Sequence, residues 1–268
     1  MRIRYLFILI ALLFTFSGCS WKLKTHGDGD DSTFTEVRRY DRLECRYLTT
    51  GDYSAIQQMS TDYPIETRTL IEKMLQLGTV DDPMINTKFL HFYQDSTLQL
   101  LIADTEAAFA NMDDINAELK TAFNNLSEWL PGFPVPEVYA QIGALDQSIV
   151  VSDRMIGISL DKYMGSDYPL YRKYYPAQMR KSMTRSYIAP DCLTFYLLSI
   201  YQLNNFDQRS QLDHDLQMGK AMYVVNRAIG RRQFNTPYVW VIARYMHRHK
   251  DMTIEQLMHK NDFSDIRN

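Results

Sequence analysis

The sequence predicts a helix-rich α+β fold, and two changes in the spacing of its hydrophobic residues carry this prediction. From Phe34 to Leu130, apolar residues recur every three or four positions, as on the buried face of a helix. Between Pro136 and Leu160 the spacing becomes two and strand-forming residues dominate. Helical spacing returns at Asp191. We therefore expect an N-terminal helical layer, a short antiparallel β-meander and C-terminal helices.

The clearest helix of the N-terminal layer is expected over Asp114–Leu130. Asp113 or Asp114 can cap its start, and Pro131 ends it. Its apolar residues share one face: Ile115, Leu119, Ala122, Phe123, Leu126, Trp129 and Leu130.

Two further helices are expected in this layer. One covers Glu66–Leu77, and Gly78 lies where a left-handed glycine commonly ends a helix. The other covers Leu98–Phe109, which has the same helical spacing of apolar residues.

Three short strands are expected after these helices. They cover Pro136–Ile142, Ser148–Ser152 and Met155–Leu160. The segments between them are short enough for hairpins, which predicts the antiparallel meander.

The C-terminal part begins with residues 161–190, which are rich in tyrosine and proline. Helices are then expected over Asp191–Tyr201, His214–Ile229 and Thr236–His249. A last helix starts at Thr253, whose hydroxyl can form a capping box with Gln256. Because no linker rich in glycine, serine or proline interrupts the chain, residues 34–268 are expected to form a single domain.

Residues 1–19 have the pattern of a bacterial lipoprotein signal. Arg2 and Arg4 form a basic start, residues 5–16 are apolar, and small residues precede Cys19. The apolar run is too short to span a bilayer as a mature helix. We expect residues 1–18 to be cleaved as the signal peptide. Cys19 then carries a diacylglycerol and a further acyl chain such as palmitate, which together anchor a protein stably to a membrane.

Residues 19–33 follow as a flexible polar tether between the lipid and the folded body. Cleavage would remove two arginines and no acidic residue, which changes the formal net charge from −3 to −5. This charge argues against a nucleic-acid partner. No later segment is apolar over the length of a second membrane span.

Two cysteines besides Cys19 remain, Cys45 and Cys192. In an oxidising compartment they could form a disulfide, and the alternative is two small buried thiols. The sequence does not give the distance between them, so both interpretations stay open.

Several sequence elements together resemble a known family. Three runs carry most of the resemblance: Pro134–Tyr139, Ile156–Gly165 and Asp167–Tyr171. Arg39-Tyr40-Asp41 is similar to an N-terminal element of the same family, and Gly219–Tyr223 to an element on a late helix. The order and spacing of these elements over Phe34–Met258 resemble those of GldB, the gliding-motility lipoprotein family of the Bacteroidota.

The resemblance implies a lipid-anchored accessory protein of the cell envelope, associated in gliding relatives with motility and type IX secretion. It implies an outer-membrane location facing the periplasm, a protein partner in the envelope and no cofactor. The family arrangement is also distantly similar to zincin-like metallopeptidases, which carry His-Glu-x-x-His on the helix after the strands. That motif is absent from this sequence, so the implied relationship is to a degenerate zincin-like arrangement.

The histidines do not form a recognisable zinc site. A catalytic zinc needs about three protein ligands that converge on one point. His247 and His249 are two positions apart on a predicted helix and therefore point in different directions. Asp213-His214-Asp215 lies at a predicted helix start, where aspartates commonly act as caps. No metal ligands and no catalytic residues are predicted, and signatures of serine hydrolases and nucleotide-binding loops are absent.

Polar residues of the family-like elements are the candidates for a cleft or a partner-binding site. They are Asp161, Tyr163, Tyr168, Tyr171, Asp191, Lys220 and Tyr223. Asp161 ends the last predicted strand and Asp191 opens the next helix, so both could face one cleft. The alternative is a structural network in which Lys220 or the Tyr163 hydroxyl donates to one of these aspartates.

Two hypotheses of different class follow. The first is a non-enzymatic lipoprotein that binds an envelope protein through its C-terminal half, where tyrosines are dense between residues 163 and 175. Core packing is an equal explanation for those tyrosines. The second is a degenerate or atypical zincin-like hydrolase with a cleft near Asp161 and Asp191.

Overall fold

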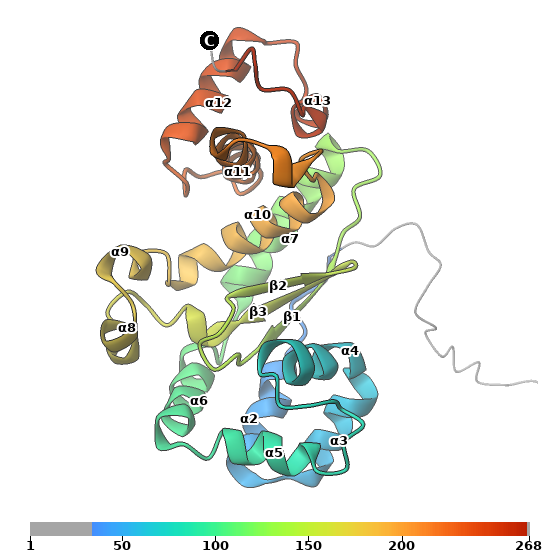
Figure 1. Cartoon of the computed structure of the whole chain (residues 1–268), viewed down its shortest axis with the longest axis vertical. Coiled ribbons are helices and arrows are strands. Elements are labelled where there is room, and N and C mark those ends of the chain that lie inside the picture. The colour runs from blue at the N-terminus through green and yellow to red at the C-terminus, as the bar shows by residue number, and fades with distance from the viewer. Residues whose placement is uncertain (1–33, 267–268) are drawn as a thin grey trace, which may run out of the picture. The chain divides into compact units, whose positions relative to one another are not determined.

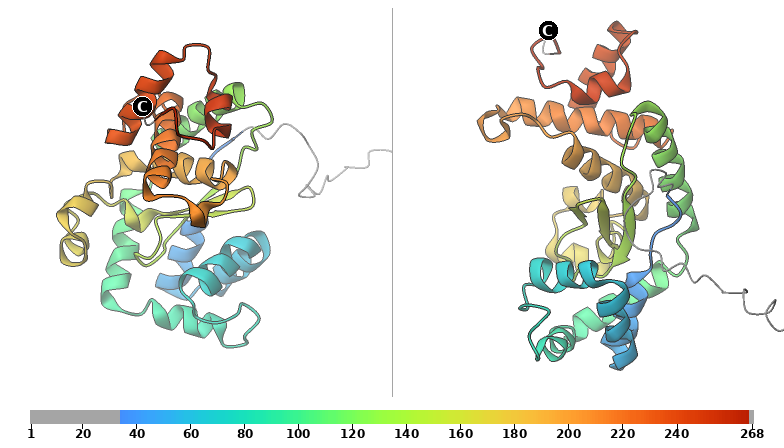
Figure 2. Two further views of the ribbon diagram at one scale, coloured as in Figure 1. Left: turned by 45° about the horizontal axis from the view of Figure 1, so that its top comes forward. Right: turned by 90° about the vertical axis from the view of Figure 1, so that its right-hand side faces the viewer.

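The computed structural model describes residues 34–266, so the lipoprotein signal, Cys19 and the tether lie outside the described residues. The predicted helix-rich α+β class is confirmed. A small three-stranded sheet has helices on both of its faces, as Figures 1 and 2 show. The helices of residues 40–92 cover one face, and the helix of residues 113–129 covers the other together with the helices that follow the sheet.

The N-terminal layer contains the predicted helices and others whose spacing was less regular. Its elements are α2 (Tyr40–Thr50), α3 (Tyr53–Asp62), α4 (Pro64–Arg68), the π-helix η1 (Thr69–Met74), α5 (Ile85–Phe92), α6 (Ser96–Ala108) and α7 (Asp113–Trp129). The prediction that Gly78 ends the helix from Glu66 was wrong. The helix widens into η1 and ends at Met74, and Gln76 adopts the left-handed conformation with φ 51°.

The predicted aspartate cap of α7 was also wrong. Asp113 and Asp114 lie inside its first turn, and the Asn111 side chain accepts from the Asp113 N–H at 2.7 Å instead. Asp114 pairs with Arg185 at 2.6 Å, so its carboxylate is used in a contact with the C-terminal half.

The three strands are β1 (Glu137–Gln141), β2 (Ile149–Ser152) and β3 (Met155–Ser159). β2 and β3 form the expected antiparallel hairpin, but the predicted meander was wrong in its order. β3 lies between the other two strands and pairs with β1 in parallel. After β1, the N–H groups of Gly143 and Leu145 donate hydrogen bonds to Asp161, which lies just beyond the end of β3. These hydrogen bonds guide the chain past the end of β3, so that β2 pairs with the opposite edge of β3.

The free edge of β1 is occupied by the segment that precedes α2. The Arg38 N–H donates to the Val138 carbonyl at 2.8 Å, and the Ala140 N–H donates to the Arg38 carbonyl at 2.9 Å. This pairing leaves no room for β2 beside β1. It also ties the start of the described chain to the sheet.

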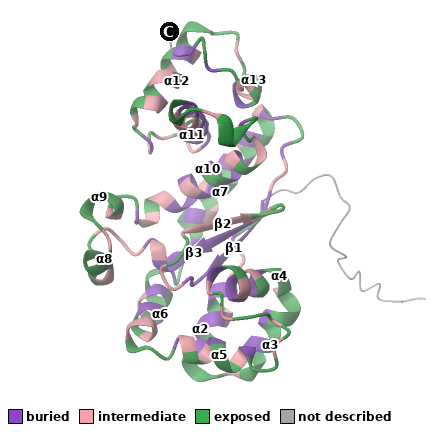
Figure 3. Ribbon diagram, viewed as in Figure 1, coloured by how far each residue is buried: buried purple, intermediate pink, exposed green. Residues whose placement is uncertain are grey.

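Alternation along the strands separates two hydrophobic layers. Val138, Ala140 and the isoleucines of β3 face a core formed with α7, α10, α11 and α12. Tyr139 of β1 faces a second core formed with α2, α3, η1 and α5, which Ile142 joins just after the strand has ended. Both faces of β1 and β3 are therefore buried, and these two strands appear mostly buried in Figure 3, whereas β2 is half-buried.

The C-terminal part contains three 3-10 turns and six helices. They are η2 (Leu160–Lys162), α8 (Pro169–Tyr174), α9 (Ala177–Arg180), η3 (Arg185–Tyr187), α10 (Ile188–Ile200), η4 (Phe206–Gln208), α11 (Gln211–Ala228), α12 (Pro237–Arg248) and α13 (Ile254–His259). The capping box of Thr253 and Gln256 is confirmed. Asp213 reciprocates the cap of Ser210 at the start of α11, as expected of an aspartate in this position. None of the helices between residues 34 and 266 has both the length and the hydrophobicity needed to cross a bilayer.

A substitution at Gly157 tests how tightly the Tyr139 ring of β1 packs against β3. A Cβ at this position would lie 2.6 Å from Cζ of Tyr139, whose ring crosses β3 at Gly157. Alanine normally stabilises a strand relative to glycine. We nevertheless expect Gly157→Ala to lower the free energy of unfolding by about 1–3 kcal/mol in urea denaturation, because the ring must move.

The double variant Gly157→Ala/Tyr139→Leu is the control for this prediction. It should lose less stability than the two single variants together, since leucine frees the space that the new methyl group needs. If the stability losses of the two single variants simply add up in the double variant, the Tyr139 ring does not need the space that Gly157 leaves.

Candidate functional site

Asp161 anchors the turn that follows β1. One carboxyl oxygen accepts from the Gly143 N–H at 2.8 Å and the other from the Leu145 N–H at 2.6 Å. The side chain is fully buried, and burial raises its pKa although the two N–H groups oppose this shift. Both oxygens are thus used to hold backbone. Ala144 and Leu145 need such support because both have positive φ, which is costly for residues with a Cβ.

Glu44 on α2 holds the same segment at Ile142. Its Oε2 accepts from the Ile142 N–H at 2.8 Å, and the Tyr93 hydroxyl donates to the Ile142 carbonyl at 2.8 Å. Glu44 is completely buried, and this burial raises its pKa well above its usual value. The segment 142–145 therefore connects the turn after β3 to the N-terminal helices.

Lys162 and two tyrosines complete this network. The Lys162 ammonium donates to the carbonyls of Leu145 and Asp146, both at 3.1 Å, and to the Tyr175 hydroxyl at 3.0 Å. The hydroxyl of Tyr171 donates to the Asp161 carbonyl and accepts from the Met164 N–H. Among the candidate residues, Asp161 and Tyr171 therefore have structural partners.

Asp191 and Tyr163 form a separate pair. The Tyr163 hydroxyl donates to Asp191 Oδ2 at 2.9 Å, as the structural interpretation of the sequence predicted. Burial raises the pKa of Asp191 to about 7, and the tyrosine hydrogen bond opposes part of that shift. Asp191 is therefore a carboxyl group that exchanges its proton near neutral pH, whereas Asp161 serves to hold backbone.

Lys220 does not donate to either aspartate. Its ammonium donates to the carbonyls of Met258 at 3.0 Å and Lys260 at 2.9 Å, which fastens α13 to α11. Its side chain is buried, and this burial lowers the pKa of Lys220 to about 7. Lys220 thus has a structural contact at the C-terminal end of the chain.

The remaining tyrosines of the dense segment divide between core and surface. Tyr163 and Tyr171 are buried, and the Tyr168 hydroxyl donates to Asp104 at 2.9 Å. Tyr174 is 55% exposed. Core packing therefore accounts for most of this segment, and Tyr174 is the ring that it presents to solvent.

The two cysteines are free, buried thiols in separate hydrophobic cores. Cys45 lies with α2 and Cys192 lies with α10. Within residues 34–266, no group of three or more histidine, cysteine, aspartate or glutamate side chains is placed to hold a metal ion.

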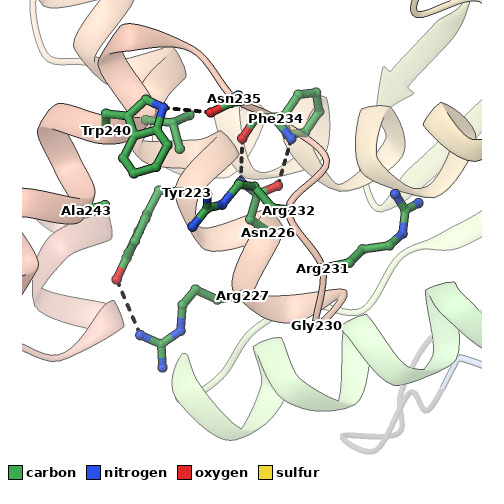
Figure 4. Close-up of a pocket in the computed structure, with 11 residues that line it drawn as sticks. Tyr223, Asn226, Arg227, Gly230, Arg231, Arg232, Phe234, Asn235, Trp240 and Ala243 are labelled. Atoms are coloured by element: carbon green, nitrogen blue, oxygen red, sulfur yellow. Dashed lines mark hydrogen bonds between the residues drawn. The ribbon is translucent and has the colours of Figure 1, made fainter.

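A pocket of about 410 Å³ lies between the end of α11, the loop after it and α12 (Figure 4). We call it the arginine–aromatic pocket. It is lined by Tyr223, Asn226, Arg227, Gly230, Arg231, Arg232, Phe234, Asn235, Val239, Trp240 and Ala243. Tyr223 is the one candidate residue from the sequence that lies in this pocket, where its hydroxyl accepts from Arg227 at 3.3 Å.

Two further family-like sequence elements, around Arg39 and Gly219, make structural contacts. Arg39 binds Asp41 through two hydrogen bonds of 2.8 and 2.7 Å and also donates to the Phe109 carbonyl. Gly219 lets α12 approach α11, because a Cβ there would lie 2.6 Å from Cβ of Tyr238. Such contacts explain why these residue types occur at these positions.

A comparison with protein families matches residues 26–235 to the family of gliding motility protein GldB. The chain belongs to this family. The resemblance was expected to extend to Met258, but the GldB match ends before α12. No curated protein and no solved structure matches the chain.

Sequence reasoning did not identify most of the pocket or the buried carboxyl of α2. Arg227, Arg231, Arg232 and Trp240 are far from the GldB-like motifs around β3. A signal was present, because residues 216–250 contain no aspartate or glutamate. The sequence contains no corresponding sign that Glu44 is buried, because a glutamate within a helix usually lies at the surface.

The raised pKa of Asp191 predicts a pH-dependent stability. As pH rises from about 4, the unfolded carboxyl loses its proton near its usual pKa of 3.8, whereas the folded one keeps it until about 7. The contribution of Asp191 is therefore complete below pH 4 and is lost as the pH rises through 7. Relative to Asp191→Asn, the wild-type protein should lose up to about 4 kcal/mol of unfolding free energy across this window, measured by urea denaturation.

The asparagine variant is the matched control because it keeps the shape and an acceptor for Tyr163. If wild type and variant show parallel pH profiles, Asp191 does not carry a raised pKa in the folded protein.

Proposed function

We propose that this GldB-family chain is a lipid-anchored accessory protein of the cell envelope that acts by binding another envelope protein. The family match supports an envelope role linked to gliding motility. The proposed anchor is the acylated Cys19, and the proposed location is the periplasmic face of the outer membrane. The proposed process is motility or the associated type IX secretion.

The observation that carries the binding role is the composition of the arginine–aromatic pocket. It places Tyr223, Trp240 and three arginines around one concave surface. Tyrosine, tryptophan and arginine are the residues most enriched at the energetic centres of protein interfaces. Trp240 is 47% exposed although it is large and apolar, so a partner that covered it would gain free energy.

The hydrolase alternative has less support from the contacts of its candidate residues. Asp161 uses both carboxyl oxygens for backbone N–H groups, and Lys220 uses its ammonium for backbone carbonyls. Asp191 remains as a group that titrates near neutral pH, with Tyr163 as its partner. A single carboxyl of this kind does not supply the nucleophile, base and oxyanion donors of an acyl-transfer site.

Photo-cross-linking in cells tests the binding role. A benzoylphenylalanine at Trp240 should cross-link the full-length lipoprotein to another envelope protein, identified by mass spectrometry. The matched control places the same group at Tyr53, which is 64% exposed on α3 at the other side of the sheet. A second control, Cys19→Ala, should release the protein from the membrane and reduce the cross-link.

Cross-links of equal yield and identity from both positions would contradict a specific binding face at the pocket. Absence of any protein cross-link at Trp240 in the membrane-bound protein would contradict the binding role itself.

A further inference from the structure

The arginine–aromatic pocket lies in the part of the chain where negative charge is missing. The whole chain has 32 acidic and 29 basic residues. From Leu216 to Lys250, however, there is no aspartate or glutamate, and seven residues are lysine or arginine. A local excess of positive charge in a net negative protein attracts anionic groups to that place.

The three arginines of the pocket differ in what they already bind. Arg231 pairs with Glu118 on α7 at 2.7 Å and donates to the Ser186 carbonyl at 2.8 Å. It points away from Trp240 in Figure 4. Arg227 and Arg232, in contrast, make no ion pair with any carboxylate of residues 34–266. Two guanidinium groups at the pocket thus lack an anionic partner there.

Aromatic rings hold both of these guanidinium groups in place. Arg232 lies over the ring of Trp240, with its Cζ 4.6 Å from the ring centre. Arg227 lies near Trp129 at 5.8 Å and donates to the Tyr223 hydroxyl. A guanidinium that rests on a ring keeps its N–H edge available for a carboxylate.

The backbone of the pocket is fixed before any ligand binds. The Asn226 amide group donates to the Phe234 carbonyl at 2.8 Å, and its oxygen accepts from the N–H groups of Gln233 and Phe234, both at 2.9 Å. The Trp240 indole donates to Asn235 at 2.6 Å. Because these groups are already ordered, binding would cost little additional conformational entropy.

The other walls of the pocket are apolar. Phe234, Val239 and Ala243 line it together with the ring of Trp240. An occupant that suits both kinds of wall carries a carboxylate next to an aromatic or aliphatic group. The volume of about 410 Å³ fits a small number of side chains rather than a folded surface.

We propose that the arginine–aromatic pocket binds an acidic, aromatic-rich linear segment of a protein partner. A carboxylate of the segment binds Arg227 and Arg232, and a neighbouring apolar side chain packs against Trp240 and Val239. This inference rests on the proposed binding role and adds the chemistry of the partner. A linear segment fits better than a lipid surface, because the charges line a concave pocket that a plane of headgroups cannot enter.

Fluorescence titration of the full-length protein in detergent tests the proposal. The probe is a short synthetic peptide in which aspartate alternates with phenylalanine, and the control peptide has asparagine in place of aspartate. Binding should quench the fluorescence of Trp240, and Trp240→Phe identifies that signal among the three tryptophans. The acidic peptide should bind at least about tenfold more tightly than the control peptide, and high salt should weaken it.

Variants assign the binding to the pocket. Arg227→Gln/Arg232→Gln should weaken binding of the acidic peptide by at least about tenfold. Arg42→Gln/Arg172→Gln makes the same charge change at exposed arginines of α2 and α8 and should leave binding unchanged. Equal loss in both double variants would mean that net charge, not the pocket, attracts the peptide, and would overturn the proposal.

Two further outcomes would also overturn it. One is the absence of binding by the acidic peptide. The other is binding to phosphatidylglycerol vesicles that is lost in Arg227→Gln/Arg232→Gln and is not competed by the peptide. That result would indicate that the pocket binds an anionic lipid instead. A protein partner that cross-links at Trp240 in cells and yet is not displaced by the peptide is a different result. It would leave the proposed binding role intact and reject only the proposal that the pocket recognises an acidic segment.

Discussion

The fold depends on two buried carboxyl groups that hold one short segment of backbone. Asp161 binds the N–H groups of Gly143 and Leu145, and Glu44 binds that of Ile142. Such groups are expensive to bury unless hydrogen bonds compensate them. Asp161 is compensated at both oxygens, whereas within residues 34–266 Glu44 is compensated at Oε2 alone. The hydrogen bonds of Asp161 fix a strained turn with two left-handed residues, and this turn carries the chain across the end of β3. The order of the strands, and with it the separation of the two hydrophobic cores, follows from that crossing.

The family-like motif around β3 is therefore best understood as an architectural element. Gly157 gives space to the Tyr139 ring, Asp161 holds the turn, and Tyr163 binds Asp191. The binding surface that we propose lies elsewhere, at α11 and α12, and the family match ends at residue 235, within the loop that lines it.

The sequence predicted the elements better than their connections. Regular spacing identified α7 and α12, and the Thr253 capping box identified the start of α13, because these signals are local. The position of β3 between β1 and β2 depends on Asp161 reaching back to Gly143, which no local pattern encodes. The pocket was missed for a related reason. Arg227 and Arg232 are of interest because neither pairs with a carboxylate of residues 34–266, and that property can be recognised only in the folded chain.

Amide hydrogen exchange at Gly143 and Leu145 tests the central claim most directly. We predict that Asp161→Asn lowers the protection of both amides by about tenfold or more, because asparagine offers one acceptor oxygen where the carboxyl group offers two. Asp146→Asn, an exposed change in the same loop, should leave their protection as it is in the wild-type protein. If both amides stay fully protected in Asp161→Asn, the buried carboxyl group does not hold the turn, and the strand order must have another cause.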